Sequence, residues 1–156
     1  MMIIGSDFID NNASFNTATK RNGAKVFVKA YATSGIVANT PMVVAFMGSG
    51  YNATVLAASL YGYVGVPEGD DAIASGCMGW VQIRGPVAGV QASAAESTGS
   101  VGHIIQWHAG TIAASSSTYL GDPTLGEIGL LTTEADASTT LDIYLTGMWA
   151  TPVAAG

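Results

Sequence analysis

The sequence predicts an all-β protein, a compact β-barrel, β-tulip or two-sheet sandwich, and three observations support this fold class. Apolar runs of strand length recur along the chain, and Gly, Ser, Thr or Asn interrupts them at spacings of about 8–12 residues. Glycine accounts for 20 of the 156 residues, roughly twice its usual share of about 7%. No long segment repeats its apolar residues with the helical period of 3.6.

The first 24 residues are polar and weakly patterned, and they predict an extended N-terminal arm. Phe8, Ile9 and Phe15 are its large apolar side chains, and we expect them to anchor the arm on the body or on a neighbouring molecule. A loosely ordered terminus is the alternative. Residues 25–156 then form a single β-rich domain, which at this length buries enough surface to fold without a disulfide or a metal.

Strands follow from local patterns in the first half of the domain. Residues 25–31 alternate with a period of two, and residues 41–47 form a continuous apolar run typical of a buried strand. Gly48-Ser49-Gly50 turns the chain. Further strands are expected over residues 51–56 and 60–66, and Pro67 stops the second of them.

The next segment predicts the one short helix and a hairpin. Asp70 can cap a helical turn near residues 68–76, and Gly76 can end it. Residues 80–84 and 87–91 are strand-like, and Gly85-Pro86 lies between them as a tight turn. We therefore expect these two strands to pair as a hairpin.

Three later strands are predicted at residues 101–109, 127–131 and 141–149, with small and polar loops over residues 92–100 and 113–119. The last strand has the clearest alternation. Leu141, Ile143, Leu145 and Trp149 fall on one of its faces, and the intervening residues fall on the other. Gly147 marks a bulge or a close backbone contact.

Composition favours an assembled protein. Charged residues make up 10% of the chain, against about 25% in average soluble proteins. The surface must therefore be filled by small and uncharged polar residues, which pack well against another protein and keep a lone monomer poorly soluble. An oligomer or coat component is expected, with a monomer of uncharged polar surface as the alternative.

The charge balance disfavours nucleic acid as a partner. The net charge is −6 and the chain has five Lys and Arg residues, so no basic stripe for phosphates is available. Lys20, Arg21 and Lys25 form a small local cluster, which is typical of a solvated or partner-docking patch. Arg84 is a candidate for an ion pair between subunits, or else a solvated strand end.

Neither a signal peptide nor a membrane span is predicted. The N-terminus lacks a basic region ahead of a long apolar run, and no stretch reaches the roughly 18 apolar residues of a membrane span. The protein is expected to stay, or to assemble, in the cytoplasm in which it is made.

No arrangement of reactive residues predicts an enzyme, a cofactor site or a metal site. His103 and His108 would point to opposite faces of one strand. The single cysteine, Cys77, has no cation beside it in sequence to activate it. The carboxylates are scattered, so a hydrolase is the weakest alternative.

Aromatic residues leave a binding module open. Tyr51, Tyr61, Tyr63, Trp80 and Trp107 could stack on sugars, although aromatics at alternating strand positions more often pack in cores or between subunits. Trp107, beside a histidine, is expected at an interface or in a half-buried position. A carbohydrate-binding β module is thus an alternative function.

Several segments resemble small virion proteins of tailed bacteriophages, in particular capsid decoration (cement) proteins. The segments are residues 63–67 (YVGVP), 72–76 (AIASG), 79–87 (GWVQIRGPV) and 143–147 (IYLTG), together with the strand after Gly102. The resemblance extends over about residues 55–149 and is one of sequence style, while residues 1–54 match less clearly.

This resemblance implies a β-barrel-like or β-tulip body that forms homotrimers at the three-fold positions of the capsid exterior. Such proteins bind the major capsid protein and brace the head, and the family has no catalytic residues to carry over. A capsid decoration protein is therefore the expected function. Another virion subunit (a tail tube, head-tail or minor coat protein) is the alternative within the same class.

Overall fold

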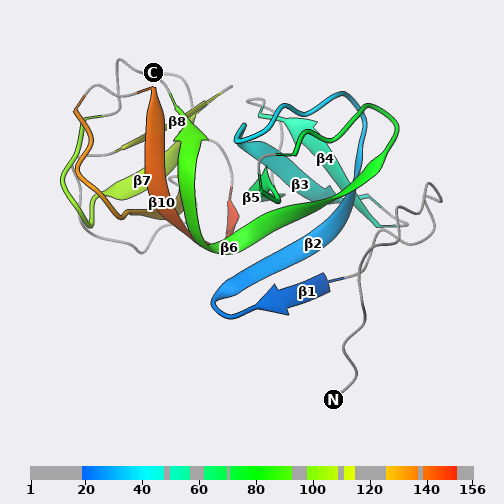
Figure 1. Cartoon of the computed structure of the whole chain (residues 1–156), viewed down its shortest axis with the longest axis horizontal. Coiled ribbons are helices and arrows are strands. Elements are labelled where there is room, and N and C mark those ends of the chain that lie inside the picture. Colours follow the sequence, from blue (N-terminus) through cyan, green and yellow to red (C-terminus); the bar gives the residue numbers. More distant parts are fainter. Residues whose placement is uncertain are drawn as a thin grey trace.

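The computed structural model describes residues 19–47, 50–56, 62–69, 71–92, 98–108, 111–114, 126–136 and 139–150 (Figure 1). All regular elements among these residues are β-strands. In chain order the strands are β1 (Thr19–Asn22), β2 (Lys25–Ala32), β3 (Met42–Phe46), β4 (Tyr51–Val55), β5 (Gly62–Pro67), β6 (Met78–Gln91), β7 (Ile104–His108), β8 (Thr111–Ala114), β9 (Glu127–Leu131), β10 (Thr140–Thr146) and β11 (Trp149–Ala150). None of the described residues belongs to a helix long and apolar enough to cross a membrane.

Five strands close into a barrel in the order β2-β4-β3-β5-β6. The barrel closes because β6 also pairs with β2, over Val26 to Tyr31. Adjacent strands of the barrel run antiparallel, except for β2 and β4, which run parallel. β1 adds to the outside of β2 as a hairpin, and β11 adds to β5. Closure satisfies the edge hydrogen bonds that an open sheet would expose.

Strand β6 is shared between the barrel and an outer sheet. Its first half pairs with β2 and β5, and its second half pairs with β10 from Arg84 to Gln91. The sheet then continues through β9 and β7 to β8. Figure 1 shows β6 crossing from the barrel to this outer layer at a sharp bend.

Gly85 stands at the position where β6 leaves the barrel. Its φ is +96°, and a Cβ there would lie 2.8 Å from the carbonyl oxygen of Ala24. A side chain would meet both a strained backbone conformation and a backbone atom that cannot move aside. The bend therefore requires glycine.

Two hydrophobic cores lie on the two faces of the barrel wall. The barrel interior is filled from β2, β3, β4 and β6, with Val44 and Val81 fully buried. The second core lies between the barrel and the outer sheet, where Val43 and Val64 pack with Ile143 and Leu145. Because β3 is buried on both faces, the apolar run at 41–47 correctly predicted a buried strand.

The short helix predicted near 68–76 is wrong for the residues that the structure describes. Ile73 instead forms an antiparallel bridge with Ile36, through backbone hydrogen bonds of 2.8 and 2.9 Å. The Ile73 side chain covers Gly79, where a Cβ would lie 2.5 Å from it. A single helical turn is costly to nucleate. The bridge to Ile36 gives both the N–H and the carbonyl group of Ile73 a hydrogen-bond partner, and the Ile73 side chain is buried as well.

The predicted hairpin at Gly85-Pro86 is also wrong, because residues 78–91 form one strand, β6. The glycine bends the strand and does not reverse it. Trp149, which we placed on the same strand as Leu145, lies on β11 and pairs with Tyr63. Gly147, with φ +72°, separates β10 from β11.

The expected arm over residues 1–24 is not supported at its C-terminal end. Thr19–Asn22 form β1, which pairs with β2 from Val28 to Lys25. Phe8, Ile9 and Phe15 lie outside the described residues. The strands predicted near residues 25–31, 41–47, 51–56 and 127–131 are confirmed, whereas β1, β8 and β11 were not predicted.

Replacing Gly85 by alanine tests the bend. We expect Gly85→Ala to lower the free energy of unfolding by about 3 kcal/mol, from the left-handed backbone and from the clash with Ala24. The matched control is Gly89→Ala, which has φ +67° but open space around its Cβ and should cost only about 1 kcal/mol. Urea denaturation measures both, and equal costs would contradict the clash at the bend.

Candidate interaction surface

Four aromatic side chains cross one end of the barrel in a row. The ring centroids are 5.6 Å apart for Phe46 and Tyr51, 6.4 Å for Tyr51 and Tyr63, and 5.1 Å for Tyr63 and Trp149. All three pairs are edge-to-face, the arrangement that aromatic quadrupoles favour. We call these four residues the aromatic row.

Strand register places the row. Phe46 is directly opposite Tyr51 on β4, and Tyr63 is directly opposite Trp149 on β11. Directly opposite residues of antiparallel strands share a face. Tyr51 and Tyr63 pack against the core of the barrel. The two middle residues of the row therefore contact the barrel core, and its two end residues are exposed, Phe46 by 51% and Trp149 by 40%.

Two arginines flank Val26, which packs against the same barrel core as Tyr51 and Tyr63 of the aromatic row. Arg21 on β1 is opposite Val26, and Val26 is in turn opposite Arg84 on β6. Both arginines are exposed, and neither forms an ion pair with another described residue. A Cβ on Gly147 would lie 3.2 Å from the Cβ of Arg84, so Arg84 adjoins the connection that leads to Trp149.

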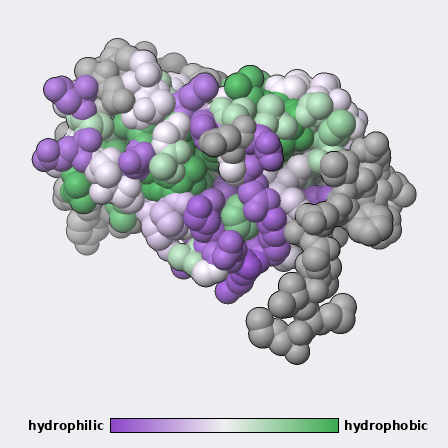
Figure 2. All heavy atoms as spheres, viewed as in Figure 1, coloured by the Kyte–Doolittle hydropathy of each residue, from purple (hydrophilic) through white to green (hydrophobic). Residues whose placement is uncertain are grey.

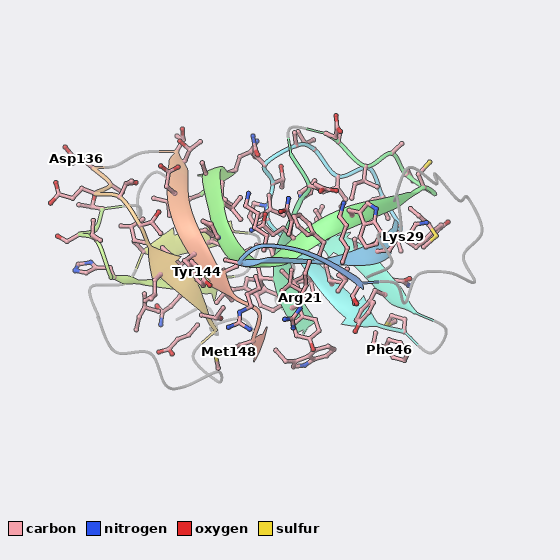
Figure 3. All side chains as sticks on the ribbon, turned by 60° about the horizontal axis from the view of Figure 1, so that its bottom comes forward. Arg21, Lys29, Phe46, Asp136, Tyr144 and Met148 are labelled. Atoms are coloured by element: carbon pink, nitrogen blue, oxygen red, sulfur yellow. The ribbon has the colours of Figure 1, made fainter. Side chains whose placement is uncertain are left out.

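Met148, in the same connection, is also exposed. Figure 3 labels Phe46 and Met148 along the lower edge of the molecule, with Arg21 between them and nearer its middle. We call Arg21, Arg84, Met148 and the aromatic row the arginine–aromatic face. Aromatic residues, Met and Arg are the types enriched in protein interfaces, and Trp, Tyr and Arg dominate their binding energy. The composition of this face is therefore that of a protein-docking surface.

A separate cluster around Lys20 links β1 to the barrel. The Nζ atom of Lys20 lies 2.5 Å from a carboxylate oxygen of Glu68, 4.6 Å from the ring centroid of Trp80 and 5.0 Å from that of Phe27. The ammonium group thus combines an ion pair with two cation–π contacts. In Figure 2 hydrophilic residues gather on the lower part of the molecule, where Figure 1 shows β1 and β2.

An open pocket of about 400 Å³ adjoins this cluster. Its lining comprises Glu68, Asp71, Ala72, Ile73, Ala74, Cys77, Met78, Gly79 and Trp80. The Cys77 thiol is free and only partly buried. No group of three or more His, Cys, Asp or Glu side chains within the described ranges could hold a metal ion.

The structure separates the residues that the sequence suggested as contacts. Arg84 is exposed, in the arginine–aromatic face. Trp107 is fully buried in the core between barrel and outer sheet, and its Nε1 has no hydrogen-bond partner among the described residues. Trp107 is therefore not on the surface of the single chain. Phe8, Ile9 and Phe15 fall outside the described part of the chain.

Sequence reasoning singled out only part of the arginine–aromatic face. The sequence indicates Tyr51 and Tyr63 as candidate binding aromatics and Arg21 as part of a basic cluster. It does not distinguish Phe46, Met148 and Trp149 from ordinary strand residues. Nothing local distinguishes Phe46 from the buried residues before it on β3. Its exposure depends on where the barrel ends, which no single segment encodes.

Comparison with known proteins gives one informative likeness. No family model matches the chain, and a search of curated proteins finds no match. Among solved structures, the chain is similar to the N base of the head fiber gp8.5 in bacteriophage phi29. The two share 16% sequence identity with a TM-score of 0.51, over 79% of this chain and 95% of the other. At that identity, the likeness shows a shared fold.

The contribution of the Lys20 cluster can be measured by substitution. We expect Lys20→Met to lower the free energy of unfolding by about 1 kcal/mol, because an ion pair and two cation–π contacts are lost in a partly exposed site. Lys25→Met is the control, since Lys25 is a half-buried lysine of β2 without an ion pair to any described residue. Denaturant melts at low salt compare the two variants, and an equal effect would show that the cluster adds nothing.

Proposed function

We propose that this chain is a structural protein of a tailed-phage virion, bound to the outside of the head as a decoration protein or as the base of a head fibre. The observation that carries the proposal is the shared fold with a head-fibre base over 79% of this chain and 95% of the other. The resemblance of residues 55–149 to phage decoration proteins supports the same class independently, because it rests on sequence segments.

The described surface supports a docking role. Its most distinctive region, the arginine–aromatic face, has the composition of a protein interface. Two cores share one barrel wall, which makes the body a stiff platform. A stiff body with a docking face suits a protein that binds a lattice, since little conformational entropy is lost when it binds. The proposal requires no catalytic step.

We propose the major capsid protein and further copies of the chain, as a homotrimer, for its partners. Multivalent binding allows each copy to contribute a modest area, because linked copies raise the effective concentration at the lattice. A decoration protein and a fibre base share this requirement. A fibre base differs from a decoration protein in that a fibre projects from the bound body.

Binding to phage heads tests the virion role. We expect the purified full-length protein to bind heads that lack it, at a fixed number of copies per head, with density on the outer surface in electron microscopy. Bovine serum albumin added at the same concentration is the control for trapping in the head pellet. Absence of saturable binding, or density confined to the tail, would overturn the head assignment.

The N-terminal residues are the proposed contact with the capsid, through Phe8, Ile9 and Phe15. Removing residues 1–18 leaves β1 in place, so the barrel should keep its thermal unfolding temperature within a few degrees while its affinity for heads falls at least tenfold. Circular dichroism melts and co-sedimentation measure the two effects. Unchanged affinity in a folded truncation would remove these residues from the contact.

A further inference from the structure

The cations of the chain are gathered in one part of the molecule. All five cations, Lys20, Arg21, Lys25, Lys29 and Arg84, lie on β1, on β2 or at the β6 position paired with Val26. Lys20 is paired with Glu68, Lys29 is only 8% exposed and Lys25 is half-buried. Arg21 and Arg84 are therefore the fully exposed cations among the described residues, and both belong to the arginine–aromatic face.

A complementary region lies on the outer sheet. Glu134 and Asp136 are exposed, and neither forms an ion pair with any residue in the described ranges. Ala135 between them pairs with Gly99 through two backbone hydrogen bonds of 2.9 Å. That pairing joins the segment that leads to Val101, which is 60% exposed, to the segment that carries the two carboxylates.

We call Val101, Glu134 and Asp136 the acidic tip. Figure 3 shows Asp136 at the side of the molecule away from Phe46. One molecule thus carries aromatic rings with two arginines at one place, and an apolar side chain with two carboxylates at another. The positive charge of the arginine–aromatic face is thus complementary to the negative charge of the acidic tip.

We propose that a second copy of this chain docks its acidic tip on the arginine–aromatic face. Arg21 and Arg84 would pair with Glu134 and Asp136 of the second copy, while Val101 packs on the aromatic row. The opposite arrangement, two arginine–aromatic faces meeting across a two-fold axis, would place like charges together. With a net charge of −6 per chain, cation-to-carboxylate contact is the electrostatically favoured approach between copies.

A contact between two different surfaces of the same chain is heterologous, so it builds either a closed ring or an open filament. This inference deepens the proposed virion role, and it rests on that role only for the expectation that the ring holds three copies. The bipolar charge pattern itself requires only that copies associate head to tail.

Charge reversal at each surface tests the contact. The face variant is Arg21→Glu with Arg84→Glu, and the tip variant is Glu134→Arg with Asp136→Arg. All four positions are exposed, so the fold should survive, as circular dichroism can verify. Light scattering after size exclusion should give wild type a multiple of 15.8 kDa, with three copies expected. Each reversed variant alone should elute as a monomer.

Two rescue experiments make the test specific to a head-to-tail contact. An equimolar mixture of the two variants should form complexes that contain both chains, because the surfaces of one variant are acidic and those of the other are basic. Two kinds of chain cannot alternate around a ring of three, so the mixture should give even-numbered complexes and not the wild-type ring. A chain carrying all four reversals should recover the wild-type mass. Asp71→Arg is the control for a carboxylate-to-arginine change elsewhere on the surface, since Asp71 is exposed and lies outside both surfaces. The assembly of this variant should not change.

The outcomes that overturn the proposal are distinct. A wild-type protein that stays monomeric, or a tip variant that assembles like wild type, shows that the acidic tip is not the partner of the arginine–aromatic face. A protein that binds heads but does not self-associate overturns this contact and leaves the virion role standing. A protein that forms rings but does not bind heads overturns the virion role and leaves the contact between copies standing.

Discussion

The backbone pairing of β6 with β2 is the constraint on which the rest of the structure depends. That pairing closes the barrel, and the same strand continues past Gly85 to start the outer sheet. One strand therefore fixes the position of both cores. Because hydrogen bonds on each side of the bend must all be satisfied, the two sheets cannot shift independently. The absence of a Cβ at Gly85 is what allows this continuity.

The surface that we regard as functional is a consequence of the same geometry. Closure of the barrel brings Val26 opposite Arg84, and the hairpin of β1 adds Arg21 beside them. The return of the chain after β10 adds Trp149 at the end of the row. Six separate parts of the chain thus supply one face. The chain has only five Lys and Arg residues, so few other cations compete with Arg21 and Arg84 for an acidic partner.

Sequence reasoning succeeded where a strand's own pattern carries the information. The alternation at 25–31 and the apolar run at 41–47 each mark a strand, because side chains alternate between faces and doubly buried strands are apolar throughout. It failed at Gly85-Pro86, where a turn-forming dipeptide lies within a continuous strand, and at Ile73, where a bridge to Ile36 replaced a helical turn. In both cases long-range pairing overrode local preference. The candidate site was predicted only in part, since Trp107 proved buried and Phe46 exposed.

By itself, the sequence determined the all-β class, the approximate place of most strands and the scarcity of charge, because these depend on side-chain periodicity and composition. Only the tertiary structure decided that five strands close into a barrel, that β6 belongs to two sheets, and that Arg21 and Arg84 lie on either side of Val26. The physical reason is that these features depend on hydrogen bonds between residues far apart in the chain. Their register is set by which strands can be buried together and by no segment alone.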